Sequence, residues 1–256
     1  KLNSLCSTVL CLTNSARLKE STERTFSILV QVGEELPRPH GDELKDGIQA
    51  MNHTLENMSD DSILNMEDVT DAENGIVLKL YSRLLISLNF DASLKAAISL
   101  RMVDLTIQSG LSSTSPIAFA SYGGLLMNIG SITEGCRLGR LALKFLQNSE
   151  YVVLTAQIFF MVYESILWAS DPLQSFSDSH RLAMTSGQLA GDYLFSSMNW
   201  RSSIIVSFTA GSDLDTVHGN IETFIKELQR RNTLQLVPYR VFILMLYSLV
   251  VSLKEG

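Results

Sequence analysis

Residues 115–146 read SPIAFASYGGLLMNIGSITEGCRLGRLALKFL, and this stretch decides the fold class. Gly130 separates two apolar segments of helical length. In the second segment three small residues, Gly135, Gly139 and Ala142, follow the i, i+4, i+7 spacing of one helix face. Glycine inside a helix costs about 1 kcal/mol relative to alanine, so this stripe needs a structural reason. Close approach of two helix axes is the simplest reason, and the stretch predicts an antiparallel helix pair with its turn at Gly130.

Beyond residue 70, apolar residues recur at helical spacing, and short joints rich in Gly, Pro and Asp separate the segments. We expect helices at 71–89, 92–109, 115–129, 132–148, 151–169, 172–187, 190–208, 214–231 and 234–254. The expected joints are Asp91, Gly110, Ser115 with Pro116, Gly130, Asp171 with Pro172, Gly187, Gly211 and Pro238. Proline is tolerated in a first helical turn, which suits Pro116 and Pro172, and also Pro238 if its helix starts near Val237.

Helices of about 15–20 residues with joints of a few residues make neighbouring helices antiparallel. The expected fold class is therefore all-α, with antiparallel helix hairpins stacked as a tetratricopeptide-like α-solenoid. The two joints marked by proline begin at residues 115 and 171, which are 56 positions apart. This spacing is not one repeat of about 34–40 residues, so the sequence shows no strict repeat.

The chain divides by pattern into two regions: 1–70, with N-terminal helices and an acidic connector, and 71–256, the stacked helix-hairpin region, continuous with the first. Helices are expected at 2–12, 15–32 with Ser15 as N-cap, 42–58 and 59–69. Between Glu34 and Glu73 there are 12 acidic residues against two basic ones, a net charge of −10, which leaves 15 acidic and 18 basic residues elsewhere. This segment is either an exposed, partly mobile connector or a docking segment for a basic partner.

The bulk composition excludes several classes of function. The net charge of −7 gives no global basic footprint, so no nucleic acid is expected as partner. The longest apolar runs, 151–163 and 241–253, are shorter than the ~20 residues of a membrane span, so no membrane is expected either. Cys6, Cys11 and Cys136 are too few for a disulfide framework, and we expect all three as core residues of a cytoplasmic protein. No initiator methionine opens the chain, and we expect a piece of a longer protein.

No group of residues predicts catalysis, a cofactor or a metal site. The glycine spacing of a phosphate-binding loop occurs once, but Cys136 and Arg137 stand where that loop needs Lys and Ser or Thr. Asp213 and Asp215 stand at an expected helix start, where capping explains them. Glu164 is an isolated carboxylate in an apolar helix, and we expect it to point outward or to pair with an arginine. The histidines are too far apart for zinc and are expected at the surface or hydrogen-bonded.

The central stretch also resembles known families. Its small residues have the spacing of those in a tetratricopeptide repeat: Gly123, Gly130, Gly135 and Ala142. Phe119 and Tyr122 approximate the aromatic residue expected early in the repeat, and its usual final proline is absent. More narrowly, Ser-Pro-x-Ala-Phe-x-x-Tyr-Gly at 115–123 and Gly-x-x-x-Gly-x-x-Ala-Leu at 135–143 resemble the helical region of large multidomain signalling ATPases.

This resemblance implies a non-catalytic scaffold or regulatory segment, which contacts a protein partner or neighbouring domains of the same chain. On the repeat register, Met127 and Asn128 would face the groove, together with Ala120 and Gly124. The alternative is a ligand-sensing helical domain that regulates an attached NTPase or kinase, suggested by the aromatic-rich helices. An all-helical enzyme is the third reading, and only the presence of carboxylates supports it.

Overall fold

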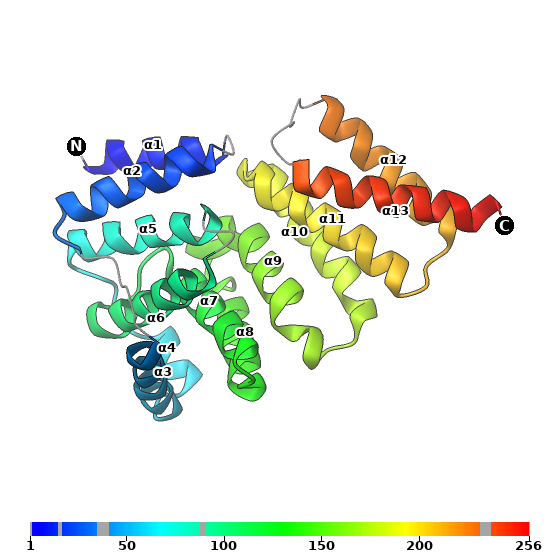
Figure 1. Ribbon diagram of the computed structural model, residues 1–256. Helices are drawn as coiled ribbons and strands as arrows, with labels where there is room; N and C mark the ends of the chain where they lie inside the picture. Colours follow the sequence, from blue (N-terminus) through cyan, green and yellow to red (C-terminus); the bar gives the residue numbers. More distant parts are fainter. Residues whose placement is uncertain (1, 15–16, 35–40, 88–90, 231–236, 256) are drawn as a thin grey trace. The chain divides into compact units, whose positions relative to one another are not determined.

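The computed structural model describes residues 2–14, 17–34, 41–87, 91–230 and 237–255, and these residues form thirteen α-helices and three short 3-10 helices (Figure 1). Within these ranges there is no strand, and the two residues Asp68 and Leu111 form an isolated β-bridge. The all-α fold class is therefore confirmed for the described residues. The expected N-cap Ser15 lies outside them. The chain forms two compact units, residues 1–152 (unit 1) and 153–256 (unit 2), whereas the division near residue 70 stays a prediction.

The described residues of unit 1 form eight α-helices that pack largely in chain order. They are α1 (Leu2–Asn14), α2 (Leu18–Gln31), α3 (Gly41–Glu56), α4 (Asp60–Leu64), α5 (Ala72–Ser87), α6 (Ala92–Ser109), α7 (Ser115–Asn128) and α8 (Ile132–Phe145). Helix α1 packs on α2, α2 on α5, α5 on α6, α6 on α7, and α7 on α8. Helix α3 departs from this order and packs on α6. The order places α3 beside the central hairpins, where it borders the candidate site.

The α7–α8 pair confirms the prediction made from the glycine stripe. The turn at Gly130 has a φ of +87°, a conformation that glycine adopts without strain. A Cβ added at Gly135 would lie 2.9 Å from both the Gly123 carbonyl oxygen and Met127 Sδ. Pro116 lies in the first turn of α7, as expected. Gly135 therefore lies where the two helices approach one another closely.

Two helices of the acidic segment, α3 and α4, belong to unit 1 and bury apolar side chains, while most of the acidic side chains of the segment are exposed. Helix α3 buries Ile48, Met51 and Leu55, and α4 buries Ile63. The three positions in α3 are spaced by three and four residues, so one face of α3 is apolar although the segment as a whole is acidic. Full burial of such side chains stabilises the fold by about 1.5–3 kcal/mol each. Burial of α3 thus depends on its apolar face and not on the total charge of the segment.

Ion pairs also hold α4 in place. Asp60, in its first turn, lies 2.8 Å from Arg137 Nη1 and 2.7 Å from Lys144 Nζ, both on α8. The Nη2 of Arg137 donates a hydrogen bond to the Leu55 carbonyl oxygen at 3.2 Å. That carbonyl is in the last turn of α3, where helix carbonyls lack partners within the helix. The α8 side chains thus connect the end of α3 and the start of α4 to the central hairpin.

Where unit 2 is described, it has five α-helices, each packed on the next: α9 (Thr155–Ser165), α10 (Phe176–Ala190), α11 (Tyr193–Thr209), α12 (Leu214–Arg230) and α13 (Val237–Glu255). The 3-10 turns are Ser149–Leu154, Leu167–Ala169 and Leu173–Ser175. Buried residues of α11, α12 and α13 share one apolar core around Ile204, Phe224 and Ile243. Helix α13 starts at Val237, so Pro238 falls in its first turn, as expected.

The expected helix at 151–169 is wrong in its length. The structure divides this stretch into a 3-10 turn, the helix Thr155–Ser165 and a second 3-10 turn. The run is mostly apolar and lacks Gly and Pro, so no helix-breaking residue marks where the helix begins and ends. Helix α10 likewise begins at Phe176, not at Pro172, which precedes a 3-10 turn.

The expected joint at Gly187 is also wrong. This glycine is buried inside α10, and a Cβ added to it would lie 2.9 Å from Ala156 Cβ. The helix ends four residues later at Gly191, whose φ of +74° is the left-handed conformation of a C-cap. Two glycines close together in sequence thus have different roles, one in packing and one in capping.

The cysteines differ from expectation as well. Cys136 is buried, but Cys6 is half-buried and Cys11 is exposed. Helix α1 turns Val9 and Thr13 inward, and Cys11, two positions from each, falls on the opposite side. In the part of the chain that the structure describes, no helix combines the length and the hydropathy that crossing a membrane requires.

Candidate functional site

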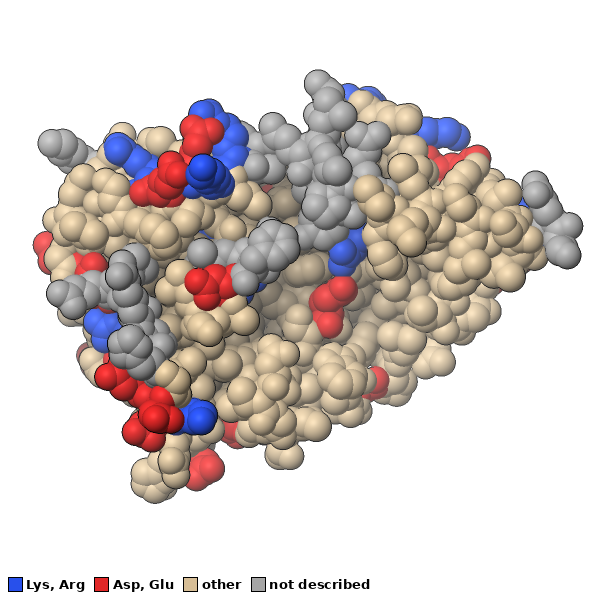
Figure 2. Space-filling view, in the orientation of Figure 1, with Lys and Arg blue, Asp and Glu red and all other residues tan. Residues whose placement is uncertain are grey.

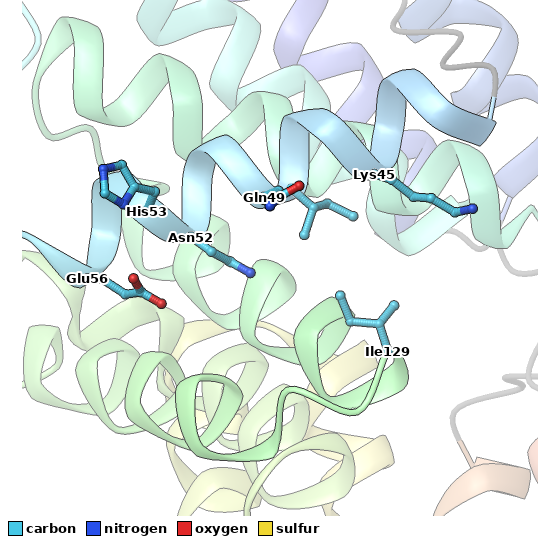
Figure 3. Close-up of a pocket in the computed structure, with 7 residues that line it drawn as sticks. Lys45, Gln49, Asn52, His53, Glu56 and Ile129 are labelled. Atoms are coloured by element: carbon cyan, nitrogen blue, oxygen red, sulfur yellow. The ribbon is translucent and has the colours of Figure 1, made fainter.

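Two hollows flank α3 in unit 1. The larger one, which we name the α3–α7 groove, has a volume of about 570 Å³ and lies between α3 and the end of α7 (Figure 3). Its lining residues are Lys45, Ile48, Gln49, Asn52, His53, Glu56 and Ile129. The smaller one, the α3–α6 groove, has a volume of about 390 Å³ and is bordered by α3 and α6. Both volumes fall in the range of binding sites for small molecules and peptide side chains.

One side of α3 supplies most of the α3–α7 groove. Lys45, Gln49, Asn52 and Glu56 are spaced by four, three and four residues, so they form a stripe along the helix. Each residue of this polar stripe comes directly after one of the apolar positions of α3, so the two sets have the same spacing. The stripe therefore lies on the flank of the helix, beside the core, and Figure 3 shows it facing the space in front of Ile129.

A buried tyrosine fixes the central side chain of this stripe. The Tyr122 hydroxyl, on α7, lies 2.8 Å from Asn52 Oδ1 and 3.2 Å from the Ile48 carbonyl oxygen. Burial raises the pKa of the Tyr122 phenol, with a further contribution from Glu134, so the hydroxyl stays protonated and donates. Asn52 therefore accepts through its oxygen. Its Nδ2 amide faces the hollow (Figure 3) and has no hydrogen-bond partner among the described residues.

The two ends of the α3–α7 groove carry opposite charges. Lys45 and Glu56 are exposed and eleven residues apart, which is about 16 Å along a helix. Extended chain covers that distance with about five residues. Ile129, 53% exposed, gives the groove an apolar wall. The arrangement offers a hydrogen-bond donor in the middle, the Lys45 ammonium at one end, where Asp42 lies 3.9 Å from it, and the Glu56 carboxylate at the other end.

The residues expected to face a groove have different environments. Met127 is half-buried and packs against Gly135 of α8, and Asn128 is exposed and donates to the Gly124 carbonyl oxygen at 3.0 Å. Ala120 is 1% exposed and so cannot line an open surface. Neither Met127 nor Asn128 is among the lining residues of the α3–α7 groove, although the next residue, Ile129, is one of them. Whether a partner contacts Met127 and Asn128 stays a prediction.

The carboxylates singled out from the sequence have structural partners. Glu164 Oε1 lies 2.9 Å from Arg201 Nη2, and its Oε2 accepts from the Ser202 hydroxyl at 2.6 Å, which confirms the expected arginine pairing. Asp213 accepts from the Thr216 backbone N–H at 2.9 Å, and this bond lowers the pKa of its carboxyl group. The expected capping role of Asp213 is therefore confirmed. Over the described ranges, no three His, Cys, Asp or Glu side chains are grouped in a way that could hold a metal ion.

Sequence reasoning did not find the pair of Tyr122 and Asn52. The two residues are 70 positions apart, and nothing in the sequence relates them. The sequence shows the three- and four-residue spacing of the polar stripe on α3. An ordinary exposed helix face has the same spacing, so this pattern does not indicate a binding site.

Comparisons with protein-family models, with curated proteins and with solved structures find no match to this chain. The fold and the groove define it as an all-α protein with a polar hollow along α3.

Proposed function

We propose that this chain is a non-catalytic helical scaffold that holds an extended segment of a protein partner, or of a neighbouring module of the same polypeptide, in the α3–α7 groove. The observation that carries this proposal is the Asn52 amide, which Tyr122 fixes by its oxygen and leaves open toward the hollow by its nitrogen. A backbone carbonyl of an extended segment is the acceptor that such a donor suits.

The geometry of the groove supports a peptide over a compact ligand. The distance between Lys45 and Glu56 corresponds to about five extended residues. A segment with an acidic residue near Lys45 and a basic residue near Glu56 would complement both ends. Ile129 would contact an apolar side chain between them.

The wider context of the proposal is a tetratricopeptide-like α-solenoid in a signalling ATPase-type protein of the cytoplasm. Packing of helices in chain order in unit 2, and largely in chain order in unit 1, where α3 is the exception, supports the solenoid arrangement. The patterns at 115–123 and 135–143 support the family context. The free cysteines favour a reducing compartment.

A selection from a random peptide library tests the proposal. Peptides enriched on the chain should lose about ten-fold or more in affinity for Asn52→Ala, because the donor in the groove is absent. Asn220→Ala on α12 is the matched control, since it removes the same group from the other unit, and binding should persist. Selected peptides that bind Asn52→Ala as tightly as the unchanged chain would refute the role of the groove.

A further inference from the structure

The α3–α6 groove lies on the other flank of α3 and has a different chemistry. Leu44 and Met51 on α3 and Leu100 on α6 line its floor, which is therefore apolar. A Cβ added at Gly47 would lie 2.8 Å from Leu100 Cδ2, which shows that the two helices approach closely along this floor. The floor is therefore a helix–helix contact, and the hollow lies above it.

The rim of this groove is acidic after its own ion pairs are counted. Arg101 lies 3.0 Å from Glu34 and 3.0 Å from Asp104, and these three groups sum to −1. The Tyr81 hydroxyl donates to Glu34 at 2.8 Å, which helps to hold the pair. Glu43 is exposed and adds a further negative charge. Among the described residues of the rim, Arg101 is the cation, and these ion pairs already neutralise it, so an incoming cation would meet net negative charge.

The surface around α3 extends this negative charge. Asp42 and Asp46 are exposed on the same helix, with Lys45 as its one basic side chain other than histidine. Figure 2 shows acidic side chains gathered in the region where Figure 1 draws α3 and α4. The segment from 34 to 73 carries −10, whereas the rest of the chain, with 18 basic and 15 acidic residues, is close to neutral. Outside this segment the net charge of the chain is therefore only +3.

We propose that the α3–α6 groove binds a basic segment of a partner protein, whose apolar side chains enter the groove while lysine or arginine side chains lie against Glu43 and Asp104. An apolar floor with an acidic rim is complementary to an amphipathic basic segment. This surface is separate from the α3–α7 groove, because helix geometry puts positions 43, 47, 50 and 54 on one flank of α3 and positions 45, 49, 52 and 56 on the other.

The test uses the full chain and a labelled synthetic peptide about four helical turns long, with leucine at every third or fourth position and lysine and alanine elsewhere. Fluorescence anisotropy should show saturable binding of this peptide. Two control peptides, one with glutamate in place of lysine and one with serine in place of leucine, should bind at least about ten-fold more weakly. Equal binding of the glutamate peptide would overturn the proposal.

Matched variants locate the binding. Glu43→Lys on the rim should weaken the lysine peptide about ten-fold, whereas Asp61→Lys, the same charge change on α4 within the acidic segment, should weaken it less than about two-fold. Equal losses would show general charge attraction and would overturn the proposal. Ala50→Trp should block the groove, and Ala190→Trp on α10 should not; both alanines are exposed, so both variants should fold.

Two further measurements distinguish the two grooves and identify the occupant. Asn52→Ala should leave binding of the lysine peptide unchanged, so failure in one groove is distinguishable from failure in the other. Sedimentation of the chain alone should show no self-association through the α3–α6 groove. Such self-association would be recognised by its loss in Ala50→Trp. If such self-association were found, a second copy would be the occupant, and the basic-partner proposal would be wrong.

Discussion

The hydroxyl of Tyr122 is a buried, hydrogen-bonded group of unit 1, and its loss should be measurable. Tyr122→Phe keeps the ring and removes the donor to Asn52, so the free energy of unfolding should fall by about 1 kcal/mol. Denaturant unfolding of the chain measures the change. Tyr163→Phe is the control, since the contact between its ring and Phe176 remains. A Tyr122→Phe variant as stable as the unchanged chain would contradict the hydrogen bond.

Gly110 is the residue where backbone conformation and close contact both require glycine. Its φ is +102°, and a Cβ there would lie 2.5 Å from the Glu67 carbonyl oxygen, which accepts the Leu111 N–H at 2.8 Å. Gly130 has a φ of +87° with open space around it. Gly130→Ala should therefore cost about 1–3 kcal/mol from backbone strain alone. Gly110→Ala should cost more, because the contact adds to the strain. Thermal melts that rank the two variants the other way would refute this reasoning.

His180 should make unit 2 less stable in mild acid. It is 1% exposed, its Nδ1 lies 2.8 Å from Asn199 Oδ1, and burial lowers its pKa below the ordinary value. The unfolded chain binds a proton at this residue below about pH 6.5, whereas the folded chain does not until a lower pH. Stability is therefore fully present above this pH and declines as the pH falls toward the folded pKa, by at most about 1.4 kcal/mol per unit.

Urea unfolding between neutral and mildly acidic pH measures this dependence. His180→Gln should flatten the decline, and His53→Gln, at an exposed position of α3, should leave it in place. If the stability of His180→Gln declines by the same amount as the pH falls, groups other than His180 cause the decline.

At the scale of elements, the attachment of α4 depends on side chains of α8. Arg137 is about a quarter exposed and contacts Asp60, Glu134 and the Leu55 carbonyl oxygen. Arg137→Met should lower the free energy of unfolding by about 1–3 kcal/mol, since it removes charge-assisted hydrogen bonds. Hydrogen exchange should rise selectively in α4 and at the end of α3. Arg181→Met, at a mostly exposed pair within α10, should cost less than about 0.5 kcal/mol. Unchanged exchange in α4 would contradict the attachment.

Elements were predictable from sequence where their ends carry distinctive residues. The α7–α8 pair was predictable because Pro116 marks a start, Gly130 marks a turn and Gly135 marks a close approach. The end of α10 was not, since Gly187 and Gly191 look alike in sequence and only their surroundings differ. Local chemistry therefore identifies most helices but does not separate a glycine used for packing from one used for capping.

At the scale of the whole molecule, the candidate site was not predictable because it depends on contacts between distant residues. Asn52 and Tyr122 meet only because α3 leaves the order in which its neighbours pack. The sequence did indicate a docking role for the acidic segment as one of two possibilities. It could not place that segment against the central hairpins, since no residue pattern encodes which helix α3 packs on.

The central claim is that the Asn52 amide meets the backbone of a bound peptide, and its own nuclear magnetic resonance signal tests this most directly. The Asn52 Nδ2 resonance is assigned by its loss in Asn52→Ala, and the chain is then titrated with a library-selected peptide. We predict that the Asn52 signal shifts as peptide is added and that this shift saturates at the same peptide concentration as binding does. The signal of the Asn128 amide, which donates within α7, should not shift. A peptide that saturates the chain and leaves the Asn52 signal unmoved would contradict the claim.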